Sequence, residues 1–235
     1  MIRKDKNETI QGLNIVILDI EGSGCIPGST PYKSGSIVSL GAVDFNTKEE
    51  FYEESRVMDG RSYDEYALKI NGFSKEQIFD SKKQSVEELL AKFEDFCYSH
   101  SSKAIAAWGE YDLKMLEAAY SYYSRKWSLP DSYINLKNIS KALVSKNKPG
   151  LSNTAIRLGM PPEEYPHIGI NGARLAAENL SVILLKKHYY ESYQIYKIPA
   201  FKEENFDFSK RIKKIDMQGF NGSSQRSPAN KSRNI

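Results

Sequence analysis

Residues 13–21 read LNIVILDIE, and this stretch decides the fold class that the sequence predicts. A short apolar run rich in β-branched residues is typical of a buried strand. The run ends in Asp19 and Glu21, which are two residues apart and therefore project from the same face of a strand. Two like charges this close repel each other unless a cation lies between them, and Mg²⁺ or Mn²⁺ prefers oxygen ligands. By itself the pair is a weak signal, because a solvated strand end explains it equally well.

The rest of the sequence predicts an α/β fold, with a mixed β-sheet flanked by helices in a single domain. Two further apolar runs, 37–45 and 50–57, follow the first after short links, so the three strands form an antiparallel meander. Ser85, with Glu88 three residues later, has the pattern of a capping box and begins a helix. Later strands and helices are expected at 104–108, 111–123, 134–136, 139–143, 151–158 and 172–188.

Bulk composition favours a soluble protein. Apolar residues make up 40% and charged residues 27% of the 235 residues, both in the ordinary globular range. The polar start lacks the apolar core of a signal peptide, and no apolar run approaches a membrane span. Cys25 and Cys97 form no CxxC pair, so two reduced thiols are expected. We therefore expect a cytoplasmic protein that does not enter a membrane.

The net charge of +3 is unevenly distributed. Residues 205–235 carry seven basic and two acidic side chains, a balance of +5, which leaves −2 for residues 1–204. The last part of the chain is also rich in Ser, Asn and Gly, a composition that cannot bury an apolar core. The sequence predicts a lead-in over 1–12, one domain over 13–200, and a basic, disordered tail over 201–235.

A glycine-rich loop follows the first strand, and its sequence can be compared with the known phosphate-binding loops. A Walker loop requires Lys after its last glycine, and none follows any of these glycines. A dinucleotide fingerprint fails because Pro27 occupies the third glycine position. The loop 22–36 is left as a rim that contacts substrate.

Two further residues could carry chemistry. Asp112 opens the helix that follows the strand 104–108, where an acidic residue also serves as a helix cap. His167 precedes the last helix, and a lone histidine at such a place is more often incidental than catalytic. Neither residue decides the function alone.

Taken together, these segments resemble the DEDDh 3′-5′ exonuclease superfamily, which has a ribonuclease H-like fold and includes ribonuclease T and the polymerase III proofreading subunit. The resemblance covers about residues 13–185 and rests on the order of several short motifs. These are Leu18-Asp19-Ile20-Glu21, Ile37-Val-Ser-Leu-Gly41, Leu68-Lys-Ile-Asn-Gly72, Trp108-Gly-Glu-Tyr-Asp112 and His167-Ile-Gly-Ile-Asn171-Gly172-Ala173.

The resemblance implies metal-dependent hydrolysis of phosphodiesters from a free 3′ end of single-stranded RNA or DNA, releasing nucleoside 5′-monophosphates. It implies two Mg²⁺ or Mn²⁺ ions held by Asp19, Glu21 and Asp112, with His167 as general base. It also implies substrate contacts at Ile20, Gly22, Ser23 and Tyr111. Whether the chain forms a homo-oligomer stays open.

The sequence departs from the superfamily at its fourth carboxylate. Gly172 stands at that position and offers no ligand, and Asn171 before it is neutral and turned about 100° away on a helix. Two hypotheses follow. The chain is an exonuclease whose activity is impaired, or it is a catalytically inactive exonuclease fold that binds nucleic acid or a protein partner.

Overall fold

Strand β1 (Ile15–Gly22) lies inside a mixed sheet in the computed structural model, which describes residues 14–143, 150–160, 168–186 and 196–197. Within these residues the sheet has six strands in the order β3-β2-β1-β4-β5-β6. The first three strands form the predicted antiparallel meander, whereas β4 and β5 run parallel to β1. The other strands are β2 (Ile37–Asp44), β3 (Glu50–Glu54), β4 (Ala104–Ala107), β5 (Ser132–Asn135) and β6 (Tyr196–Lys197).

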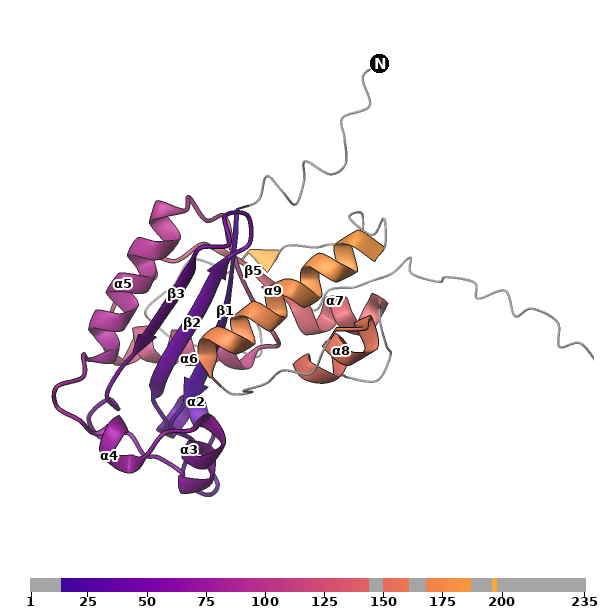
Figure 1. The fold of residues 1–235 in the computed structure, drawn as a ribbon. Coiled ribbons are helices and arrows are strands. Elements are labelled where there is room, and N and C mark those ends of the chain that lie inside the picture. The colour runs from indigo at the N-terminus through magenta and orange to yellow at the C-terminus, as the bar shows by residue number, and fades with distance from the viewer. Residues whose placement is uncertain (1–13, 144–149, 161–167, 187–195, 198–235) are drawn as a thin grey trace, which may run out of the picture.

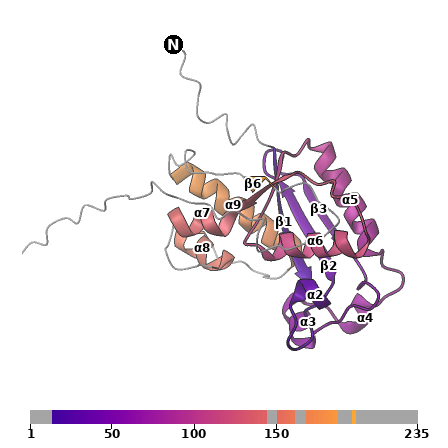
Figure 2. The ribbon, with the colours of Figure 1, turned by 180° about the vertical axis from the view of Figure 1, so that it is seen from behind.

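Helices cover both faces of this sheet (Figures 1 and 2). Helices α5 (Val86–Ser99) and α6 (Tyr111–Tyr122) share a buried cluster with Val16, Leu18 and Ile20 of β1. Helices α7 (Leu136–Leu143), α8 (Leu151–Leu158) and α9 (Gly169–Lys186) pack instead with Ile15 and Ile17. Because side chains alternate along a strand, Asp19 and Glu21 continue the series that faces α9. The α/β class and the mixed sheet are confirmed.

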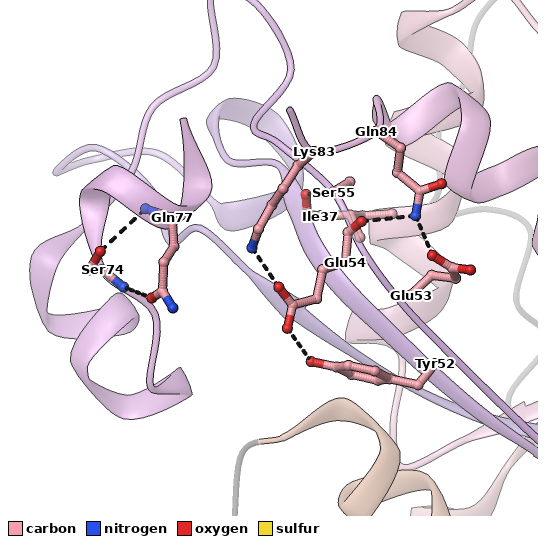
Figure 3. Close-up of polar contacts among 9 residues, drawn as sticks. All are labelled: Ile37, Tyr52, Glu53, Glu54, Ser55, Ser74, Gln77, Lys83 and Gln84. Atoms are coloured by element: carbon pink, nitrogen blue, oxygen red, sulfur yellow. Dashed lines mark hydrogen bonds and ion pairs between the residues drawn. The ribbon is translucent and has the colours of Figure 1, made fainter. Parts of the chain in front are cut away.

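The capping box at Ser85 is confirmed and begins α5. Its hydroxyl accepts the Glu88 backbone N–H, and the Glu88 carboxylate accepts the Ser85 N–H at 2.7 Å. A second box, Ser74 with Gln77, begins α4 (Lys75–Ile78) (Figure 3). The sequence did not predict the short helices α2 (Pro31–Ser34) and α3 (Glu65–Asn71). Helices of four and seven residues have too few positions to show a clear period.

Strand β3 is an edge of the sheet, and its polar side chains are held by neighbours (Figure 3). Lys83 pairs with Glu54, which also accepts the Tyr52 hydroxyl at 2.9 Å. Gln84 donates to the Glu53 carboxylate. Charged residues on an edge strand disfavour pairing with another chain.

Other expectations concern the chain ends and the thiols. Cys25 and Cys97 are both free, as predicted. None of the described helices is long and apolar enough to cross a membrane. The predicted lead-in and the predicted tail lie outside the described residues.

Candidate active site

The carboxylates of the first motif lie at a cavity beyond the end of β4. The cavity has a volume of about 440 Å³. Its described lining includes Asp19 and Glu21 of β1, Asp112 of α6 and Gly172 of α9. The structure thus brings together three predicted ligands that are spread over more than 90 residues of sequence. The remaining described residues of the lining are Ile20, Trp108, Tyr111, Gly150, Leu151, Ser152 and Asn153.

Asp112 is fixed to β1 by a backbone hydrogen bond. The pairing of β4 with β1 ends at Ile17, so the next amides on that side of β1 need other partners. The Ile20 N–H donates to Asp112 Oδ1 at 2.9 Å. Asp112 is only 4% exposed, and burial raises the pKa of its carboxyl to about 6 although the backbone hydrogen bonds lower it. The residue therefore supports the strand as well as facing the cavity.

Tyr111 lies against the end of β1, and a glycine there is what permits its approach. A Cβ built on Gly22 would be 2.2 Å from the Tyr111 hydroxyl oxygen. Asn71 donates to the Gly22 carbonyl at 2.8 Å and holds this strand end in place. Burial raises the pKa of Tyr111, and so do the nearby charges of Asp112, Glu21 and Asp19. The phenol therefore lies within electrostatic reach of all three carboxylates.

The four predicted substrate contacts divide into two groups. Ile20 and Tyr111 line the cavity, and Tyr111 is 37% exposed. Gly22 lies against the Tyr111 hydroxyl and is not among the lining residues. Ser23 is fully buried, and its hydroxyl donates to the Ser62 carbonyl at 2.7 Å and accepts the Ser36 N–H. The structure does not bring the Ser23 side chain to the cavity.

Gly172 occupies the place from which a carboxylate would face Asp19. A Cβ added at Gly172 would be 2.3 Å from Asp19 Oδ2. The close approach of α9 depends on Gly41, because a Cβ there would be 2.2 Å from the backbone nitrogen of Ile170. Asn171 is not a described lining residue of the cavity, and its side-chain oxygen accepts a hydrogen bond from Arg174 at 3.0 Å. The Asn171 amide oxygen is thus used by Arg174 in this structure.

The predicted general base, His167, lies outside the described residues. The start of α8, residues 150–153, contributes to the cavity and was missed in the sequence. The sequence carried no signal for it, because the contact depends on how α8 packs against α9.

The cavity is acidic. Within the described part of its lining there are three carboxylates and no Lys or Arg. Among the described residues, no three His, Cys, Asp or Glu side chains are grouped closely enough to hold one metal ion together. Asp19 and Glu21 thus form a pair, and Asp112 lines the same cavity.

The fold is that of the ribonuclease H-like 3′-5′ exonucleases. The nuclease domain of 3′hExo, a DEDDh family member solved with rAMP, has a TM-score of 0.64 at 18% identity, covering 79% of this chain and 96% of that one. S. pombe Pop2p in its Mg²⁺ and Mn²⁺ bound form has a TM-score of 0.54 at 14% identity, covering 79% and 87%. Exonuclease X with 5′ overhanging duplex DNA has a TM-score of 0.52 at 16% identity, covering 74% and 92%. At these identities the likeness establishes the fold.

The family is given by sequence. The family model of the 3′-5′ exoribonuclease Rv2179c-like domain matches residues 14–184. This match spans well over half of the chain, and the chain belongs to that family. A search of the curated proteins finds no match.

Proposed function

We propose that the chain binds the 3′ end of single-stranded RNA in the acidic cavity and removes nucleotides from that end as 5′-monophosphates. The cavity with three facing carboxylates, in a member of an exoribonuclease family, is the observation that carries this proposal. Gly172 is expected to make the reaction slow, because it takes one anionic ligand from the site.

The donor set fits a divalent cation. Carboxylate oxygens are the ligands that Mg²⁺ and Mn²⁺ prefer, and no described basic side chain lines the cavity to neutralise them. Asp19 and Glu21 would hold the ion, and Asp112 would act through water because one of its oxygens already accepts the Ile20 N–H. Such an ion, when bound, favours ionisation of water and offsets charge on the phosphate.

The chain's own residues orient the RNA. Tyr111 offers a partly exposed ring beside the carboxylates, on which the terminal base can stack. The start of α8 lines the cavity, and a helix N-terminus favours a phosphate. His167 comes five residues before Gly172 in the sequence, so its role in taking a proton from water stays part of the proposal.

The second candidate function is binding of a 3′ end without cleavage. Position 172 favours it, since glycine supplies neither a ligand nor a negative charge beside Asp19. The fold and the cavity are the same in both cases. Only turnover separates them.

A gel assay of the full chain on 5′-labelled single-stranded RNA and DNA tests both candidates. We expect stepwise shortening of RNA in Mg²⁺ or Mn²⁺, none in EDTA, and none with the Asp19→Asn/Glu21→Gln variant. RNA that is bound but never shortened would establish the second candidate. A chain that neither binds nor shortens RNA would refute both.

A further inference from the structure

Helix α6 leads away from the cavity and carries aromatic and basic side chains along one side. Tyr111 lies at its cavity end, and Lys114, Ala118 and Tyr122 follow at the three- and four-residue spacing of a single helix face. Tyr111 and Tyr122 are 37% and 39% exposed. The distance along the axis from Tyr111 to Tyr122 is about 16 Å.

Helix α2 packs beside α6 and adds to this surface. Lys114 Nζ lies 5.4 Å from the centre of the Tyr32 ring, and the Arg61 guanidinium carbon lies 5.3 Å from the centre of the Tyr122 ring. Arg61 also donates to the Lys33 carbonyl, which places the exposed Lys33 next to it. We name these six residues the α2–α6 strip: Tyr32, Lys33, Arg61, Tyr111, Lys114 and Tyr122.

Hydrogen bonds within the protein preorganise the strip. Ser62 holds the Ser34 carbonyl with both its backbone N–H, at 2.7 Å, and its hydroxyl, at 2.8 Å. Tyr122 donates its hydroxyl to the Asp59 carbonyl at 2.8 Å, which fixes the orientation of its ring. Lys114 forms an ion pair with Glu110 at 3.5 Å, which offsets part of its charge. Side chains already in place lose little freedom when they bind.

We propose that the α2–α6 strip binds the single-stranded nucleic acid that leads into the cavity, a few nucleotides upstream of the 3′ end. Alternating rings and cations match the alternating bases and phosphates of a single strand, and the strip is continuous with the cavity through Tyr111. At about 3.4 Å per nucleotide, its length of about 16 Å suits about five stacked bases. The position of the 3′ end rests on the proposed function, but binding along the strip requires no cleavage.

Binding measured in EDTA separates the strip from catalysis. The probes are 5′-fluorescein-labelled oligouridylates of three and twelve nucleotides, titrated with the full chain at several salt concentrations. Lys33→Gln should weaken binding of the twelve-nucleotide probe about five-fold at 0.1 M salt and lower its salt slope by about 0.7, the value for one lost phosphate contact. The affinity for the three-nucleotide probe should fall much less.

Three further variants make the result specific. Arg61→Gln should act like Lys33→Gln, and Arg61→Lys should restore the salt slope because it keeps the charge. Lys103→Gln is the matched control: it removes the same charge at the start of β4, the opposite end of the sheet from Asp19 and Glu21. Thermal unfolding of each variant checks that the fold is intact.

Three results would each overturn the proposal that the strip binds nucleic acid. They are an equal loss of affinity for both probes, no loss for either probe, and a loss with Lys103→Gln equal to that with Lys33→Gln. Failure of the proposed function looks different, because the long probe would still bind along the strip while RNA was never shortened. Conversely, normal cleavage with a Lys33→Gln variant that binds the long probe unchanged would refute the strip alone.

Discussion

Restoring a carboxylate at position 172 is the sharpest test of how the cavity works. The Gly172→Asp change places an acidic side chain in the fourth residue of α9, facing Asp19. On helix propensity alone, replacing this glycine gains less than about 1 kcal/mol. The structure adds a larger opposing effect. A Cβ here would be 2.3 Å from Asp19 Oδ2 and 2.6 Å from Asp19 Cγ, so the whole Asp19 side chain must move to make room.

The size of the effect follows from the charges. Two unit charges about 4 Å apart repel by about 4 kcal/mol near a protein surface. Less the helix gain, Gly172→Asp should lower the free energy of unfolding by roughly 3 kcal/mol without metal, a fall in Tm of roughly 6–12 °C for a chain of this size. A divalent cation removes the repulsion and stabilises the folded state by about 2.7 kcal/mol at a hundred times its Kd.

The assay is thermal unfolding in EDTA and in Mn²⁺, with cleavage of labelled RNA measured in parallel. We expect Gly172→Asp to melt lower than the unmodified chain in EDTA, to recover most of the loss in Mn²⁺, and to cleave RNA faster. Gly172→Asn is the matched control, because it has nearly the same shape and no charge.

Equal Tm values for the Asp and Asn variants in EDTA, together with equal shifts in Mn²⁺, would show that position 172 does not face the metal-binding carboxylates. An unmodified chain that already cleaves RNA as fast as Gly172→Asp would show that the missing carboxylate does not limit the reaction.

Three further predictions concern other parts of the chain. Burial lowers the pKa of His100, but hydrogen bonds to the Phe96 carbonyl and to Glu49 at 2.7 Å outweigh this effect and raise the pKa. The His100–Glu49 pair should therefore stabilise the fold by up to about 1 kcal/mol below pH 6.5, and this contribution should be lost as the pH rises. In denaturant unfolding, Glu49→Gln should cost more stability at pH 5.5 than at pH 8.5. Asp112→Asn should keep the fold because an amide oxygen still accepts the Ile20 N–H, whereas Asp112→Leu should cost about 1–3 kcal/mol, and an equal Tm for the two would contradict this. Truncation after residue 204 removes the +5 charge and should weaken RNA binding and flatten its salt dependence; unchanged affinity would leave the tail as a solubilising end.

The parts of the fold that the sequence predicted depend on local patterns. The strand that ends in Asp19 and Glu21 has a period of two, and the box at Ser85 has a fixed spacing, so both could be predicted without tertiary information. In each case the signal is complete within a few residues.

The parts that it missed depend on contacts between distant segments. Ser23 was expected to contact substrate because it follows the carboxylate pair, but its hydroxyl is used by Ser62 and Ser36. The start of α8 reaches the cavity because α8 packs on α9. Neither periodicity nor a short motif predicts contacts between segments that are distant in the sequence.

The two roles of Asp112 bear on whether the chain is an active enzyme. A side-chain oxygen at the start of α6 accepts the Ile20 N–H where β4 has ended, so the fold alone explains an acceptor at position 112. The presence of Asp112 is therefore weaker evidence for catalysis than the presence of Asp19 and Glu21, which face α9 and the cavity. The balance between a slow exoribonuclease and a binding protein thus depends on one quantity, the metal affinity of a two-carboxylate site opposite Gly172. Isothermal titration of Mn²⁺ into the unmodified chain and the Asp19→Asn/Glu21→Gln variant measures it, and heat of binding that the double variant abolishes would favour the enzyme.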